Sequence, residues 1–137
     1  MKYTLHIGST YMFSLVFIAA GVFHVLEPEG FARMMVGWPF PYVIVYTTAC
    51  LEWLMAGLLF LPNVRKQAAK WIAVYLILVS PANLFAAQVG IPFPGQESTE
   101  RAALWLRLIG QPLLILWAMS IAKWENSRNN DHQIMMK

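Results

Sequence analysis

A single carboxylate interrupts an apolar run near the middle of the chain. Glu52 lies at the centre of residues 42–61, and no other side chain in that run is charged at neutral pH. A carboxylate inside a bilayer is costly and is normally kept only where it faces a partner or a cavity. Glu52 is therefore the first candidate functional group, as a proton donor or acceptor, and the other stretches must supply its partner.

The other apolar stretches each contain at least one strongly polar side chain. His24 ends the first stretch, Asn83 lies in the third, and Arg107 and Gln111 lie four residues apart in the fourth, on one helix face. Counted along each helix from the same side of the membrane, the five residues lie between ~3 Å deep for His24 and ~15 Å deep for Glu52. This predicts a ligand pocket that opens on one side, formed by His24, Glu52, Asn83, Arg107 and Gln111.

Charge pairing suggests a role for each member of this set. Arg107 is the natural counter-ion for Glu52, because its long stem can bridge a difference in depth and each charge would otherwise be disfavoured in low dielectric. Asn83 and Gln111 could satisfy the remaining donors and acceptors. The alternative is that the network only fixes helix register, since interhelical polar contacts in membranes contribute about 0.6 kcal/mol on average. For His24, near the boundary, a structural role is favoured over ligand binding.

No metal site is predicted. The apolar stretches contain one histidine, the chain has a single cysteine (Cys50), and there is no HxxxH spacing. The lone cysteine also excludes an intrachain disulfide and a CxxC pair. No haem, flavin, nicotinamide or iron–sulfur motif is visible, so no cofactor is evident, although a quinone is compatible with the pocket.

The elements that must position these residues are membrane-spanning helices. Apolar residues make up 58% of the 137-residue chain and charged residues 12%, about half the charge of a water-soluble domain. Four stretches reach the length of about 20 residues that a spanning helix needs. The predicted fold is an all-α polytopic membrane protein, an antiparallel bundle of four transmembrane helices. We expect one membrane domain (1–137) with spans at 7–26, 42–61, 71–90 and 102–122 and a mobile polar tail over 125–137.

The connections between the spans are rich in proline. Pro28 stops the first helix, and a short interfacial helix is expected over residues 31–36, with Phe31, Met34 and Met35 towards lipid. The strings 37–41 and 90–95 lie on one side of the membrane. They could cap the bundle, although stiff turns with aromatic anchors are the simpler interpretation. Within the spans, Pro81 and Pro112 predict helix bends.

The distribution of basic residues predicts the topology. Seven lie in the N-terminus, the 62–70 loop and the tail, whereas the 27–41 and 91–101 loops hold only Arg33 and Arg101. The positive-inside rule therefore places both termini in the cytoplasm of a multi-pass protein of the cell (inner) membrane. The basic residues form no continuous stripe, so nucleic acid is not an expected partner.

The chain resembles the DoxX-like family of small four-span membrane proteins from about Tyr11 to Trp124. The matching pieces are Gly21-Val22-Phe23-His24 with Glu27-Pro28, Leu51-Glu52-Trp53 with Gly57, Pro81-Ala82-Asn83, and Leu106-Arg107-Leu108-Ile109-Gly110-Gln111. The resemblance implies a four-helix membrane bundle and a link to redox chemistry, because the family is named after subunits of a thiosulfate:quinone oxidoreductase. The chain lacks the cysteine pairs of thiol-exchanging relatives, which argues against direct disulfide chemistry.

These observations lead to one main functional hypothesis. We expect a component of a membrane redox system whose pocket binds a quinone-like or other small amphipathic molecule; whether it is an enzyme stays open. The alternative is a non-catalytic membrane partner or scaffold subunit of an enzyme complex, whose buried polar residues only specify packing. Transport is disfavoured, because four spans leave little room for alternating access without oligomerisation. Expected partners are the lipid bilayer, a small amphipathic ligand, and a membrane or periplasmic redox partner or a second copy of the chain.

Overall fold

The computed structural model describes residues 2–92, 94–97 and 100–135; the side chains of residues 2, 3, 101, 104, 107 and 129–135 lie outside this description. Its described part is all-helical, as expected. The elements, in chain order, are α1 (Lys2–Leu26), α2 (Pro28–Ala32), the 3₁₀ helix η1 (Arg33–Met35), α3 (Pro41–Phe60), α4 (Arg65–Val89) and α5 (Arg101–Met135).

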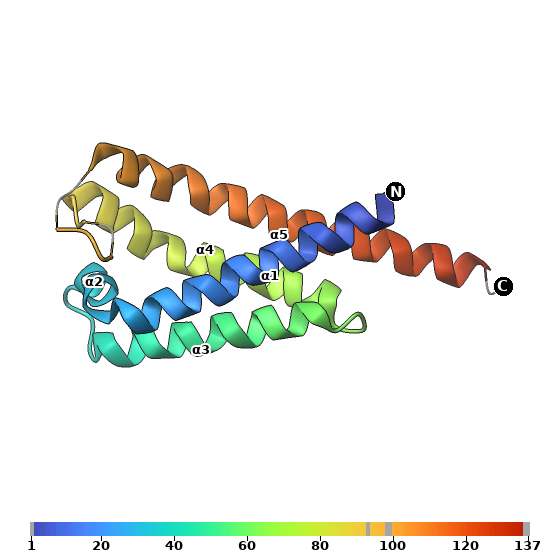
Figure 1. Cartoon of the computed structure of the whole chain (residues 1–137), viewed down its shortest axis with the longest axis horizontal. Helices are drawn as coiled ribbons and strands as arrows, with labels where there is room; N and C mark the ends of the chain where they lie inside the picture. The colour runs from blue at the N-terminus through green and yellow to red at the C-terminus, as the bar shows by residue number, and fades with distance from the viewer. Residues whose placement is uncertain (1, 93, 98–99, 136–137) are drawn as a thin grey trace.

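The four long helices, α1, α3, α4 and α5, lie side by side, and each runs in the opposite direction to the one before it (Figure 1). Both chain termini lie at one end of the bundle, here called the terminal end, and α2 lies at the opposite end, here called the α2 end. The main contacts join α1 to α3 and α4 to α5, while α3 and α4 touch less extensively. The bundle is therefore built from two helix pairs, α1 with α3 and α4 with α5.

The apolar core joins the two helix pairs. Phe13 and Phe17 of α1 are buried, with the Phe13 ring 4.9 Å from the Trp117 ring of α5 and the Phe17 ring 6.3 Å from the Tyr75 ring of α4. Small buried residues let the helix backbones approach one another. They are Ala49 and Ala56 in α3, Ala68, Ala69, Ala73 and Ala86 in α4, and Ala118 and Ala122 in α5.

Three helices of the described chain are long and apolar enough to cross a membrane, namely Thr4–Leu26, Pro41–Phe60 and Arg65–Val89. They also expose large apolar side chains, such as Leu54 and Leu78. Large exposed apolar surfaces are unusual in soluble monomers and are expected where lipid covers the protein. The prediction of membrane-spanning helices is therefore supported by both length and exposure.

The helix ends follow the predicted spans at the α2 end and depart from them at the terminal end. α1 stops at Leu26, and α4 stops at Val89, where Gly90 adopts the left-handed conformation with φ of 74°. α4, however, begins at Arg65 rather than residue 71, and α5 continues to Met135. The polar tail predicted from residue 125 therefore starts inside a helix.

The short segment after α1 forms helix, as expected, but the prediction that Met34 faces lipid is wrong. Phe31 of α2 stacks on the His24 ring with centroids 3.8 Å apart, and Met34 of η1 is buried. Helix α2 also lies against Pro94, because a Cβ on Gly30 would fall 2.7 Å from the Pro94 Cα. Met34 turns inward, and the half-buried Phe31 covers the His24 ring.

Candidate functional site

The carboxylate of Glu52 lies between three helices. It is 6% exposed, and its Oε1 accepts a hydrogen bond of 2.9 Å from the Tyr75 hydroxyl of α4. Its Oε2 lies 3.1 Å from Nδ1 of His24 on α1. The same Nδ1 lies 2.9 Å from the Ala20 carbonyl, one turn earlier. The Tyr75 hydroxyl thus lies beside one carboxylate oxygen and the His24 imidazole beside the other. We call His24, Glu52 and Tyr75 the carboxylate cluster.

The contact between His24 and Glu52 corrects their predicted difference in depth. That prediction assumed that all helices end at the same level. In the structure the Ser14 hydroxyl donates to the Ala56 carbonyl at 2.8 Å, and Trp53 Nε1 donates to the Ile18 carbonyl at 3.2 Å. Counted from these contacts, the first residue of α3 lies further towards the α2 end than the last residue of α1. Side chains also lean towards the N-terminus of their own helix. In an antiparallel pair, His24 and Glu52 therefore lean towards each other.

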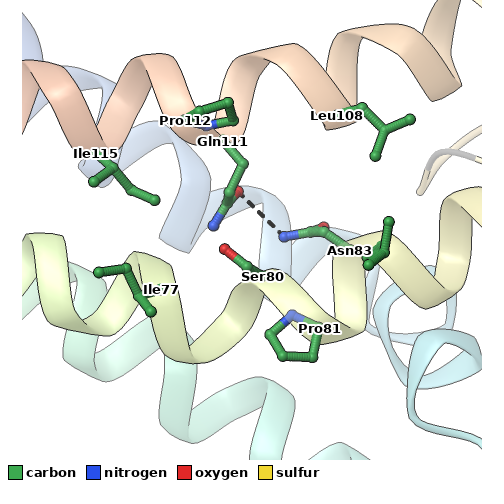
Figure 2. A pocket seen from close by; sticks show the side chains of 9 residues that line it. Ile77, Ser80, Pro81, Asn83, Leu108, Gln111, Pro112 and Ile115 are labelled. Carbon is green, nitrogen blue, oxygen red and sulfur yellow. Dashed lines mark hydrogen bonds between the residues drawn. The ribbon is translucent and has the colours of Figure 1, made fainter.

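A second polar group lies between α4 and α5 (Figure 2). Asn83 Nδ2 donates to Gln111 Oε1 at 3.3 Å, and Gln111 Nε2 donates to the Leu76 carbonyl at 2.8 Å. The Ser80 hydroxyl donates to the same carbonyl at 2.7 Å. In Figure 2 Gln111 reaches from α5 towards α4, where Ser80 and Asn83 point back at it. We call Ser80, Asn83 and Gln111 the amide cluster.

The amide cluster lines a pocket of about 410 Å³. The rest of its wall is apolar, formed by Ile77, Pro81, Leu84, Leu108, Pro112 and Ile115. A proline inside a helix has no backbone N–H to donate. It therefore leaves one carbonyl of the preceding turn unpaired and bends the helix. Pro81 in α4 and Pro112 in α5 both border the pocket. The predicted bends thus fall where the two helices enclose this space.

The structure brings the predicted site residues together in pairs. His24 meets Glu52 in the carboxylate cluster, and Asn83 meets Gln111 in the amide cluster. The side chain of Arg107 lies outside the described part of the chain, so its predicted pairing with Glu52 stays a prediction. Tyr75 is immediately followed in α4 by Leu76, whose carbonyl binds Gln111, so the two clusters lie back to back across α4.

Tyr75 is a site residue that sequence reasoning missed. Tyr75 lies in an apolar stretch among other aromatic residues, and an aromatic ring in such a stretch indicates a role in core packing. A buried tyrosine hydroxyl usually finds a hydrogen-bond partner. The signal that could have found it is the need of a buried carboxylate for donors on both oxygens.

A buried ion pair at the terminal end was also missed. Arg65 of α4 and Glu125 of α5 are each 1% exposed, with Arg65 Nη1 3.2 Å from Glu125 Oε1. Arg65 Nε donates to the Leu59 carbonyl at 2.7 Å, and Arg128 Nη2 lies 2.7 Å from Glu125 Oε2. The sequence predicts a loop for Arg65 and a mobile tail for Glu125. Their pairing explains why α4 starts early and α5 continues.

Chemically, the two clusters offer different functions. The carboxylate cluster joins a carboxyl, an imidazole and a phenol, which are groups that exchange protons. The amide cluster offers side-chain N–H groups and oxygens at the wall of an apolar pocket, the combination that binds small ligands and fixes their orientation.

Comparison with known proteins adds a family assignment. Residues 13–122 match a family model described as a domain of unknown function (DUF8561). This region begins in α1, ends in α5 and contains both clusters. No curated protein and no solved structure shows significant similarity to the chain. Because the match covers more than half of its length, the chain belongs to the DUF8561 family.

Proposed function

We propose that the chain is a four-span protein of the cell membrane that binds a small amphipathic molecule in the pocket between α4 and α5. The class that suits the pocket best is a quinone-like molecule, with carbonyl oxygens on an apolar ring and an apolar tail. In this account the protein is a component of a membrane redox system, as its resemblance to the DoxX-like family implies.

The observation that carries this proposal is the amide cluster in the wall of an apolar pocket. Each side-chain amide has two N–H groups. Within the described residues, Asn83 and Gln111 each use one such donor, to Gln111 Oε1 and to the Leu76 carbonyl. The remaining donors suit the carbonyl oxygens of a quinone, and the volume of about 410 Å³ lies in the range of small-molecule sites.

The apolar rim of the pocket supports a ligand that arrives from the bilayer. Ile77, Leu84 and Leu108 line the pocket and are also exposed on the outside of the bundle. In a membrane these side chains face lipid tails, so an apolar tail can extend past them without leaving hydrocarbon. A water-soluble polar ligand gains nothing from such a rim.

The fourth span and the orientation are parts of the same proposal. Residues 102–122 of α5 contain one charged residue, Arg107, and α5 packs along α4. The even number of long helices agrees with two termini at one end of the bundle, as Figure 1 shows. The excess of Lys and Arg near that end supports a cytoplasmic location for both termini.

The test is a titration of the protein in lipid nanodiscs with decyl-ubiquinone. We expect saturable tryptophan quenching and an increase in the melting temperature. Replacing one amide by leucine, as in Gln111→Leu, removes a hydrogen bond worth about 1 kcal/mol and should weaken binding roughly fivefold. Gln67→Leu, an exposed glutamine on the same helix as Asn83, is the matched control.

Decylbenzene is the matched control ligand, because it has the ring and the tail but no carbonyl. Equal effects of decylbenzene and decyl-ubiquinone, or equal affinities in Gln111→Leu and the unchanged protein, would contradict the proposed role of the amide cluster. Absence of binding by any quinone would instead favour the alternative of a non-catalytic partner subunit.

A further inference from the structure

The carboxylate cluster contains a buried oxygen with no hydrogen-bond donor. In the described residues the buried side-chain polar atoms that lack a hydrogen bond are Glu52 Oε2, Glu125 Oε2 and Arg128 Nε. Glu125 Oε2 lies against the Arg128 guanidinium. Glu52 Oε2 has only His24 Nδ1 at 3.1 Å, and that nitrogen is already 2.9 Å from the Ala20 carbonyl. A buried carboxylate oxygen without a hydrogen-bond donor is energetically costly.

The imidazole of His24 connects this oxygen to the surface of the protein. Its Nδ1 faces Glu52, whereas its Nε2 makes no hydrogen bond within the described residues and yet is not one of their buried unpartnered atoms. Nε2 is therefore accessible from outside, in agreement with a side-chain exposure of 14%. One nitrogen lies inside against a carboxylate and the other reaches the surface, which is the arrangement that a proton relay requires.

The surroundings hold the ring in this position. Phe31 of α2 stacks on one ring face, and the backbone of Ala20 fixes Nδ1. The ionisable groups that face Glu52 from the packed helices of the described chain are His24 from α1 and Tyr75 from α4. Tyr75 donates its proton to Oε1, so Oε2 is the oxygen left for exchange.

We infer that Glu52 is an intramembrane proton-binding site that is loaded and unloaded through His24. In the unloaded state Glu52 is a carboxylate and the neutral imidazole carries its proton on Nδ1, directed at the Ala20 carbonyl. A hydronium ion from the aqueous phase gives a proton to Nε2, and the Nδ1 proton passes to Glu52 Oε2. The products are one water, a neutral carboxylic acid and an imidazole protonated on Nε2. Unloading is the reverse of these transfers.

In the loaded state the acid proton on Oε2 points at the Nδ1 lone pair. The oxygen that lacks a donor before loading then has its own proton and a hydrogen-bond acceptor. The opposing change is at Ala20, whose carbonyl loses the Nδ1–H donor. Because each state gains one hydrogen bond and loses another, the site can exchange its proton rather than hold it permanently. This inference needs the bilayer location but no quinone or other ligand.

The test follows Glu52 protonation by infrared spectroscopy in nanodiscs after a rapid drop in pH. Because the chain has other glutamates, the signal is the difference between the unchanged protein and Glu52→Gln. A carboxylic acid C=O band should remain in that difference and should shift when glutamate is ¹³C-labelled. In His24→Phe, which keeps a ring against Phe31 but removes both nitrogens, the band should form about a hundredfold more slowly, as expected when a positioned proton-transfer group is lost. His6→Phe, a histidine that stacks on Trp124 elsewhere in the bundle, is the matched control and should behave like the unchanged protein.

Identical bands in the unchanged protein and in Glu52→Gln, or a Glu52 band that forms as fast in His24→Phe as in the control, would overturn the inference. Should His24→Phe fail to fold, ¹⁵N spectroscopy of the unchanged protein decides the question. The His24 proton should move from Nδ1 to Nε2 over the same pH range in which the carboxylic acid band appears. A tautomer that stays constant through that range would also overturn the inference. Neither measurement involves decyl-ubiquinone, so failure here leaves the pocket proposal intact, and the reverse also holds.

Discussion

The indole of Trp53 lies directly against the backbone of α1 at Gly21. A Cβ on Gly21 would fall 2.4 Å from Trp53 Nε1, and this nitrogen donates to the Ile18 carbonyl at 3.2 Å. The absence of a side chain at one position thus sets how closely α1 and α3 approach. Because His24 lies one turn after Gly21 and Glu52 directly precedes Trp53, the same approach positions the carboxylate cluster.

Gly21→Ala should therefore destabilise the bundle. The added methyl group must push Trp53 aside, and overpacking of this kind costs about 1–3 kcal/mol. The measurement is thermal or denaturant unfolding in detergent. Gly8→Ala is the matched control on the same helix, because a Cβ there meets nothing within 4 Å. Equal stability of the two variants would show that the Gly21–Trp53 contact does not hold the helices together.

Arg65→Met should be among the more damaging substitutions in the chain. It leaves Glu125 buried with Arg128 as its remaining cationic partner, and breaking a buried ion pair costs about 3–5 kcal/mol. The double variant Arg65→Met/Glu125→Met removes both charges and should recover most of that loss. Lys70→Met, an exposed cation on the same helix, is the control and should have little effect. A double variant as unstable as the single one would contradict this account of the pair.

Tyr75→Phe should destabilise the protein by removing the hydrogen bond to Glu52 Oε1. A hydrogen bond to a charged group contributes about 1.5–3 kcal/mol, more than the average interhelical contact in membranes of about 0.6 kcal/mol. Tyr46→Phe, which removes a hydroxyl from a more exposed ring on α3, is the control for unfolding measurements. A loss no larger than that of Tyr46→Phe would mean that the hydroxyl does not stabilise the buried carboxylate.

Gly30→Ala should loosen the α2 end of the bundle. The new Cβ would meet the Pro94 backbone at 2.7 Å, and backbone atoms cannot rotate away as a side chain can. We expect a cost of about 1–3 kcal/mol and faster hydrogen exchange in α2, which carries Phe31 over His24. Gly110→Ala, where nothing lies within 4 Å of the added Cβ, is the control. Unchanged exchange in α2 would argue against a close contact between α2 and Pro94.

Much of the fold could be predicted from local sequence. The apolar stretches gave the long helices, Pro28 marked the stop after α1, and Gly90 follows the last residue of α4. These signals are local, because a proline or a left-handed residue ends a helix wherever the rest of the chain lies. The terminal end was not predictable in the same way, since Arg65 and Glu125 meet across sixty residues of sequence.

The sequence predicted which residues form the candidate site better than it predicted how those residues group. His24, Glu52, Asn83 and Gln111 all contact another polar group, but they form two clusters rather than one. Which pairs form depends on helix register, and the register is set by contacts such as Ser14 with the Ala56 carbonyl. Counting residues from helix ends cannot supply it. Tyr75 was missed because only its position beside Glu52 separates it from a core aromatic residue.

The most direct test of the pocket is a distance measurement between ligand and protein. Solid-state NMR in nanodiscs can detect dipolar coupling between a ¹³C-labelled carbonyl of decyl-ubiquinone and the ¹⁵N-labelled side-chain amide of Gln111. The account predicts a coupling that corresponds to a hydrogen bond, with nitrogen and oxygen about 2.7–3.2 Å apart. Saturable binding without that coupling, or with the carbonyl located at His24 and Glu52 instead, would contradict the assignment of the pocket between α4 and α5.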